Sequence, residues 1–108
     1  MTKTESIARK ILGWKLNRWD RWYDFEEKKF IPTKDFIPDK RLEDAMLVVK
    51  KLEKAGYKYS VNGPCKVSFN DITATGKTLP EAITNAAYSI IERYSADADT
   101  NRFWRELT

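Results

Sequence analysis

Histidine is missing from this chain of 108 residues, and cysteine occurs once, at Cys65. Without histidine, acid–base chemistry has to rely on carboxylates, lysines or tyrosines with shifted pKa values. A single cysteine excludes an internal disulfide and favours a reducing compartment. No apolar run approaches the roughly 20 residues of a membrane span, and the first ten residues lack the apolar centre of a signal peptide. We therefore expect a cytosolic protein without a membrane segment.

The composition is that of one folded domain, with 42% hydrophobic and 33% charged residues. A chain of this length buries roughly two-thirds of its unfolded surface and has no room for a second domain. The net charge is +6 for residues 1–80 and −2 for residues 81–108. This distribution favours an anionic partner, and an ordinary solvated surface is the alternative explanation.

The clearest structural signal lies in residues 66–94, where the hydrophobic period changes. Val67 and Phe69 alternate with polar residues, as in a half-buried strand. The apolar residues that follow recur at three- and four-residue steps, which predicts a helix from about Leu79 to Tyr94. Thr78 and Glu81 form a predicted capping box at its start.

Similar signals predict the other elements. We expect a helix over 3–12, capped by Thr2 and stopped by Gly13, and a second helix capped by Asp39 and closed by Gly56. Two hairpins are expected between the helices, one with its turn at residues 26–29 and one with its turn at Asn62–Gly63.

The order helix, hairpin, helix, hairpin, helix predicts an α+β fold. We expect a mainly antiparallel four-stranded sheet covered by helices, as an α/β/α sandwich, in a single domain over residues 1–94. Residues 95–108 form a predicted tail, in which Phe103, Trp104 and Leu107 favour a short helix docking on the domain or on a partner.

Lys77 and Thr78 belong to a TGKT segment between a predicted strand and a predicted helix. The nucleotide-hydrolase loop that this segment resembles needs a further glycine where the chain has Asp71, so hydrolysis is disfavoured. Two interpretations stay open. The helix N-terminus with Lys77 and Thr78 binds one phosphate or carboxylate, or the segment is an ordinary capped helix entry.

Trp19, Arg21 and Trp22 lie in a segment where aromatic and cationic residues interleave, together with Trp14, Lys15, Arg18 and Tyr23. Such a segment can stack bases while neutralising phosphates, or bind another partner. The alternative is that the tryptophans pack in the core. Exposure of both Trp19 and Trp22 would favour binding, because exposed aromatic patches usually mark binding sites.

No arrangement of residues indicates catalysis. Cys65 occupies an apolar strand position without a histidine to activate it. The acidic residues at 20, 24, 26 and 27 lack the spacing of a calcium loop, and a charged hairpin tip explains them. We expect no metal and no cofactor, and we favour a binding protein over an enzyme. A cluster of carboxylates with strongly raised pKa values in a cleft would instead indicate an enzyme.

Several segments together resemble the phage ABA sandwich domain family over most of residues 5–94. They are GWK at 13–15, WYDFEEKKFIP at 22–32, DAMLVVKKLEKAGYKYSVNG at 44–63, and VSFND with ATGKTLPEAITNAAYSII at 67–91. The resemblance implies a phage or prophage origin and an α/β/α layered sheet. It transfers no catalytic or ligand-binding residue to this chain.

These observations lead to a hypothesis of a non-enzymatic phage accessory protein in the host cytoplasm, acting in host takeover or against host defence. In one form it sequesters a small nucleotide-like anion through Trp19, Arg21, Trp22, Lys77 and Thr78. In the other form it blocks a host protein through an aromatic surface. The alternative is a nucleic-acid-binding module of phage replication or regulation, and homo-oligomerisation fits each of them.

Overall fold

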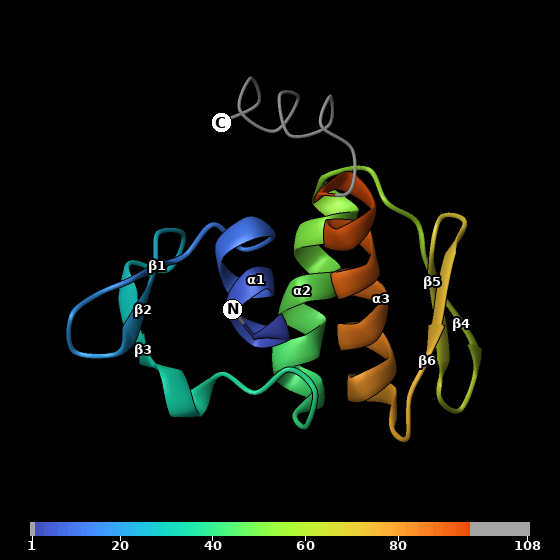
Figure 1. The fold of residues 1–108 in the computed structure, drawn as a ribbon, viewed down its shortest axis with the longest axis horizontal. Coiled ribbons are helices and arrows are strands. Elements are labelled where there is room, and N and C mark those ends of the chain that lie inside the picture. The colour runs from blue at the N-terminus through green and yellow to red at the C-terminus, as the bar shows by residue number, and fades with distance from the viewer. Residues whose placement is uncertain (1, 96–108) are drawn as a thin grey trace.

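Three α-helices form the middle layer of the fold, and a three-stranded antiparallel sheet lies on each side of them (Figure 1). The computed structural model describes residues 2–95. The first sheet contains β1 (Lys15–Leu16), β2 (Arg21–Asp24) and β3 (Lys29–Pro32). The second sheet contains β4 (Tyr59–Gly63), β5 (Lys66–Phe69) and β6 (Ile72–Thr75). The helices are α1 (Lys3–Lys10), α2 (Leu42–Lys54) and α3 (Leu79–Ser95), with a short 3-10 helix at Thr33–Asp35.

The α+β class is confirmed, whereas the single four-stranded sheet is wrong. Each predicted hairpin is part of a three-stranded sheet, because β1 precedes the first hairpin and β6 follows the second. The two sheets do not join, because the inner face of each one packs against a different side of the helical layer (Figure 1). The predicted turn at Asn62–Gly63 is also wrong. Gly63 pairs with Lys66 after a register shift, and the turn falls at Pro64–Cys65.

Capping residues fix the starts of α1 and α3 as predicted. The Thr2 hydroxyl accepts a hydrogen bond from the Glu5 N–H at 3.1 Å, and the Thr78 hydroxyl accepts one from the Glu81 N–H at 3.3 Å. Gly56, just after α2, has φ +101°, a left-handed conformation that glycine adopts without steric cost. The sequence was sufficient to predict these helix ends, because each of these residues helps to satisfy free backbone groups within one helical turn.

Asp39 does not cap α2, contrary to the prediction. Residues 38–40 form a turn instead, closed by the Arg41 N–H donating to the Ile37 carbonyl at 2.8 Å. The acidic side chain that bonds to the backbone before α2 is Asp44, in the first turn of the helix. It accepts a hydrogen bond from the Ile37 N–H at 3.0 Å. The helix therefore begins at Leu42, which is exposed.

All three helices run in the same direction, so their C-terminal ends gather at one end of the molecule (Figure 1). Near the opposite end, the Lys3 ammonium in the first turn of α1 donates to the Asn85 side chain of α3 at 3.1 Å. The gathered ends carry the negative poles of three helix dipoles. Basic residues in the last turns compensate them: Arg9, Lys10, Lys51, Lys54 and Arg93.

The core extends across the helical layer into both sheets. Trp22 and Phe36 are buried on the side of the first sheet, and Val67 and Phe69 on the side of the second. The apolar stripe of α3 is buried as predicted, at Ile83, Ala86, Ala87, Ile90 and Ile91. The predicted docking of Phe103, Trp104 and Leu107 lies outside the described residues.

Candidate functional site

The structure divides the predicted aromatic and cationic segment between core and surface. Trp22 is 1% exposed, and the Arg9 guanidinium lies 5.5 Å from the centre of its ring. Trp19 is 69% exposed in the turn between β1 and β2, and Arg21 is exposed at the start of β2. Trp22 is therefore a packing residue, whereas Trp19 and Arg21 are available to a partner.

Lys77 and Thr78 do not lie near these residues. They are exposed in the segment between β6 and α3, on the opposite side of the helical layer from the first sheet (Figure 1). The five predicted ligand-binding residues therefore do not form one site.

The N-terminus of α3 already uses the groups that an anion would bind. The Glu81 carboxylate accepts a hydrogen bond from the Lys77 N–H at 3.2 Å, and the Gly76 N–H donates to the Cys65 carbonyl at 3.1 Å. A Cβ at Gly76 would approach the Ala82 nitrogen to 2.6 Å, so this glycine permits close packing of the loop on the helix. The arrangement favours the capped helix entry over phosphate binding.

A different group of side chains gathers on the outer face of the first sheet. Side chains alternate along β2, so Trp22 and Asp24 are buried while Arg21 and Tyr23 are directed outward. Tyr23 lies opposite Lys15 of β1 and opposite Phe30 of β3. Lys15, Tyr23 and Phe30 therefore form a row across the three strands, on the side of the sheet away from the helices.

Aromatic rings cluster at the centre of this outer face. The Tyr23 ring centre lies 4.8 Å from that of Phe25, with the planes at 87°, and 4.9 Å from that of Phe30, with the planes at 57°. Phe25 and Phe30 are 51% and 55% exposed. We call the surface formed by Lys15, Arg21, Tyr23, Phe25 and Phe30 the aromatic face. It exposes phenylalanine rings that have no polar group to interact with water.

A buried carboxylate fixes the turn that presents Phe25. Asp24 is 8% exposed and accepts hydrogen bonds from the N–H groups of Glu26 and Glu27, at 3.0 and 3.2 Å. These bonds hold the turn between β2 and β3 in one conformation, as aspartate commonly does in turns. Phe25 therefore stays on the outside without being buried itself.

Cations surround the aromatic face on the side of the β1–β2 turn. Lys15 and Arg21 belong to the face, and the Arg18 guanidinium lies 5.0 Å from the centre of the Trp19 ring. None of these three cations forms an ion pair with another residue in the part of the chain that the structure describes. Their charges are therefore available to an acidic partner.

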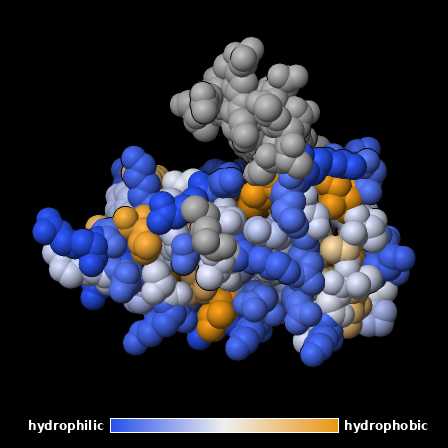
Figure 2. Space-filling view, in the orientation of Figure 1, coloured by the Kyte–Doolittle hydropathy of each residue, from blue (hydrophilic) through white to orange (hydrophobic). Residues whose placement is uncertain are grey.

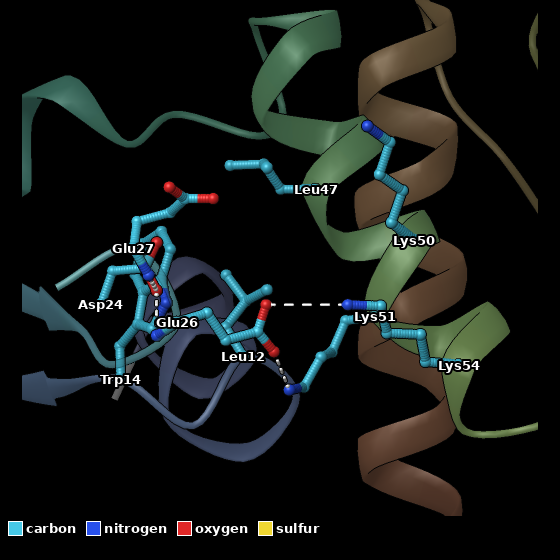
Figure 3. A pocket seen from close by; sticks show the side chains of 9 residues that line it. All are labelled: Leu12, Trp14, Asp24, Glu26, Glu27, Leu47, Lys50, Lys51 and Lys54. Carbon is cyan, nitrogen blue, oxygen red and sulfur yellow. Dashed lines mark hydrogen bonds and ion pairs between the residues drawn. The ribbon is translucent and has the colours of Figure 1, made fainter.

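A hollow of about 200 Å³ lies on the other side of the same hairpin, between the β2–β3 turn and α2 (Figure 3). The Glu26 carboxylate is turned toward Lys51 and Lys54, at 2.8 and 3.8 Å, while Glu27 is directed away from them. The hydrogen bond and charge of Lys51, followed by the charge of Lys54, lower the pKa of Glu26. The hollow is smaller than typical ligand pockets of 300–1,000 Å³, and its ion pairs join the turn to α2.

The sequence prediction placed Tyr23 beside the tryptophans and did not include Phe25 or Phe30 among the site residues. A signal for them was present. Trp22 and Tyr23 are adjacent, so a strand through them presents an aromatic residue on each of its faces. Since a three-stranded sheet in this fold buries only one face, the second aromatic set had to be exposed or covered by a partner.

The described part of the chain offers no other chemistry at this surface. Within residues 2–95, no group of three or more cysteine, aspartate and glutamate side chains is placed to hold a metal ion. None of the helices described is both long and apolar enough to cross a bilayer. The aromatic face is thus the surface whose exposure most needs an explanation.

Fold and surface define a small α+β domain in which helices and sheets are layered and one sheet face exposes aromatic side chains. The chain belongs to the Phage ABA sandwich domain family, whose model matches residues 5–88. The resemblance noted in the sequence is thereby confirmed. The matched region contains the whole aromatic face. No curated protein and no solved structure matches the chain.

Proposed function

We propose that this protein is a non-enzymatic phage accessory factor that binds a host protein through the aromatic face. The observation that carries the proposal is the cluster in which exposed Phe25 and Phe30 pack on half-buried Tyr23, on a sheet face that nothing else in the described chain covers. Exposed apolar clusters rimmed by polar residues mark interaction sites, and a few central aromatic and arginine side chains supply most of the binding energy.

The face suits a partner with an apolar centre and an acidic rim. The two phenylalanine rings provide area to bury, and the uncommitted charges of Lys15, Arg18 and Arg21 border them. Complementary charges at a rim speed association and select the partner. Figure 2 shows that hydrophilic residues cover most of the side in view, with one of the separate hydrophobic patches over the first sheet.

The same face is less suited to nucleic acid. Base stacking needs open ring faces beside a continuous positive groove. Here the Phe25 ring stands at 87° to the Tyr23 ring, and residues 15–35 contain six basic and five acidic residues. Small-anion sequestration has weaker support, because Lys77 and Thr78 lie apart from the aromatic face and their helix end is already capped.

The decisive experiment compares three forms of the full chain, each tagged and used to capture proteins from host lysate. The double variant Phe25→Ala/Phe30→Ala removes the exposed rings, and Ser60→Ala/Thr73→Ala changes two exposed positions on the second sheet. We expect one partner to be retained by the wild type and the control and lost by the phenylalanine variant. With the purified partner, calorimetry should show about a thirtyfold weaker Kd for the phenylalanine variant, since a hot spot contributes 2 kcal/mol or more.

Equal capture by all three forms would contradict the proposal. Tight binding of single-stranded DNA or RNA that weakens steeply with salt would establish the nucleic-acid alternative instead. A nucleotide that raises the melting temperature would establish the sequestration form, because a ligand at 100 times its Kd adds about 2.7 kcal/mol of stability.

A further inference from the structure

The two sheets have edge strands β1, β3, β4 and β6, and three of these are unsuited to pairing with a further strand. β1 has only two residues. On β3 the Thr33 N–H donates toward β2, to the Asp20 carbonyl, so Pro32 lies on the free side, where it has no N–H to offer. On β6 the Thr75 carbonyl accepts a hydrogen bond from the Asn85 side chain of α3 at 2.9 Å. The remaining edge is β4, at the outer margin of the second sheet (Figure 1).

The backbone groups of β4 are directed alternately toward β5 and toward the free side. Both groups of Lys58 are directed toward β5, because its carbonyl accepts from the Asn70 N–H at 2.9 Å and its N–H donates to the Asn70 side chain at 2.8 Å. Alternation then directs the groups of Ser60 toward β5, and those of Tyr59 and Val61 away from it. The free side of β4 therefore presents the N–H and carbonyl groups of Tyr59 and Val61, which have no partner among the described residues.

The Val61 side chain is exposed on a face of the sheet that is buried one strand further in. Val61 and Val67 are cross-strand neighbours and share the face toward the helices, yet Val67 is 0% exposed and Val61 is 53% exposed. Tyr59 lies on the same face and is half-buried, with its ring centre 5.3 Å from that of Phe69. The helices thus cover β5 but leave apolar area on β4 that a further strand would bury.

A second copy of β4, running antiparallel, matches this edge. With Ser60 on a two-fold axis, Tyr59 lies opposite the partner's Val61, and Val61 lies opposite the partner's Tyr59. Each of these pairs exchanges two backbone hydrogen bonds, so every free group of the edge is used. Aromatic and β-branched side chains form favourable cross-strand pairs. Lys58, which is the one charged residue in 57–63, lies opposite the partner's Asn62, so no like charges face each other across the strands.

Neighbouring registers use the edge less well. An axis through Tyr59 would pair Val61 with the partner's Tyr57, and the Tyr57 N–H already donates to the Leu52 carbonyl at 3.0 Å. An axis through Val61 would pair Tyr59 with the partner's Gly63, which lies beyond the register shift of β4. The register with Ser60 on the axis is therefore the one that the edge favours.

We propose that the protein forms a two-fold symmetric dimer through β4, in which the second sheets of two copies join into one continuous antiparallel sheet. Such an isologous contact closes on itself and protects an edge that is otherwise open to aggregation. The dimer contact lies on the other side of the helical layer from the aromatic face and does not depend on the proposed host-protein binding. Its consequence is that each dimer presents two aromatic faces, which permits bivalent binding.

Sedimentation of the full chain over a range of concentrations measures the dimer. Val61→Pro removes an N–H that is directed away from β5, so it weakens pairing between copies without breaking the ladder within the chain. Val61→Lys places a charge on the apolar area of the edge. Val61→Thr keeps the branched shape and the N–H, and Thr75→Lys adds the same charge to an exposed position of the opposite edge strand.

We expect a dimer for the wild type and for both controls, and a dimer Kd at least about tenfold weaker for Val61→Pro and Val61→Lys. Circular dichroism establishes that each variant is folded, and Val61→Lys, at an exposed position, keeps the test decisive if Val61→Pro does not fold. A wild type that is monomeric at the highest attainable concentration would overturn the proposal. A dimer that neither Val61 variant weakens would overturn it as well, because the contact would then lie elsewhere.

Disulfide trapping in a Cys65→Ser background tests the register. Opposite residues at the axis have Cα atoms about 4.5 Å apart, within the range that a disulfide bridges, so Ser60→Cys should link two chains. Lys58→Cys is the control, because two copies of residue 58 would be separated by roughly 13 Å along the strands. We expect the Ser60→Cys chains to link at least about tenfold faster. Equal rates for the two variants would overturn the proposed pairing.

Discussion

The first and second sheets are both three-stranded, antiparallel and covered on one face by the helices, yet their outer faces have opposite chemistry. The first sheet presents Tyr23 and Phe30 side by side. The second presents Ser60, Ser68 and Thr73 in one row across its strands. The Ser68 hydroxyl is hydrogen-bonded to Thr73 at 3.0 Å and accepts from the Asn62 amide, so that row is satisfied within the chain and by water.

The contrast between the two outer faces shows which side chains of the sheets the fold requires. Both inner faces are mainly apolar because they pack into the core, and the hydroxyl row shows that the outer face of a sheet in this domain can be polar. The aromatic rings on the other outer face stabilise their hairpin through cross-strand contacts, but the core does not need them to be exposed. A binding role accounts for them, since it makes use of the exposed area.

The largest expected effect tests the inner and outer faces of the first sheet against each other. Trp22→Ala should lower the free energy of unfolding by about 3–5 kcal/mol, because it removes a buried ring from the core. Trp19→Ala, three residues away and 69% exposed, should change it by no more than about 0.5 kcal/mol. Urea denaturation followed by circular dichroism measures both. A comparable loss for the two variants would contradict the assignment of Trp19 to the free surface.

A smaller effect is expected where the second sheet passes into α3. Gly76→Ala places a Cβ 2.6 Å from the Ala82 nitrogen and 2.9 Å from the Glu81 carbonyl carbon, both of them backbone atoms. Relieving this overlap requires a backbone shift, so we expect a loss of about 1–3 kcal/mol in the free energy of unfolding. Gly63→Ala is the control, because its Cβ would be no closer than 3.8 Å to a neighbour. Similar melting temperatures for the two variants would show that the loop does not press on the helix.

The hydroxyl row itself should contribute less. Ser68→Ala breaks two side-chain hydrogen bonds at a position that is 8% exposed, and we expect a loss of about 1 kcal/mol. Thr84→Val makes a useful contrast, because the buried Thr84 hydroxyl has no hydrogen-bond partner among the described residues. That substitution should raise the free energy of unfolding by about 1 kcal/mol. Chemical denaturation measures the free energy of unfolding of both variants. A change in the same direction for the two would contradict these hydrogen-bond contributions.

The helices could be predicted from the sequence because their signals are local. The division of the strands into two sheets could not be predicted in this way. The start of α3 depends on Thr78 and Glu81, which meet within one turn. By contrast β1 has only two residues, Lys15 and Leu16, too few to show any period, and its partner Tyr23 is recognisable only once the sheet exists. In the second hairpin the alternation of Val67 and Phe69 with polar residues correctly indicated the buried face. In the first hairpin Trp22 and Tyr23 place an aromatic residue on each face, so the spacing alone does not choose which face the helices cover.

The sequence therefore indicated the segment of the aromatic face and one of its residues, Arg21, but not Phe25 or Phe30. It identified the aromatic and cationic segment, and the structure moved Trp22 into the core. Phe25 and Phe30 became the exposed residues instead, because the turn between β2 and β3 aligns Phe30 with Tyr23. Lys77 and Thr78 were proposed from a motif that the fold uses to cap a helix.

The smallest expected effect concerns the exposed ion pairs that tie each sheet to a helix. Glu26 joins the first sheet to Lys51 and Lys54 of α2, and Asp71 joins the second sheet to Arg93 of α3 at 3.2 Å. Hydrogen bonds and charges from these partners lower the pKa of both carboxyls from ordinary values of 4.5 and 3.8. A carboxyl whose pKa is lower in the folded state stabilises the fold above its unfolded pKa, and this contribution disappears as the pH falls through the folded pKa.

Glu26→Gln and Asp71→Asn should therefore each lower the unfolding midpoint slightly at neutral pH and have no such effect in acid well below the ordinary pKa values. Glu27→Gln is the matched control, because Glu27 lies in the same turn as Glu26 and makes no ion pair with a described residue. Denaturation curves of the variants at both pH values, repeated in high salt to screen the pairs, measure the contributions. The midpoint difference of Glu26→Gln could persist in acid while that of Asp71→Asn vanished. The contact of the first sheet with α2 would then depend on packing in the hollow rather than on charge. The two sheets would in that case differ in how they attach to the helices as well as in their outer surfaces.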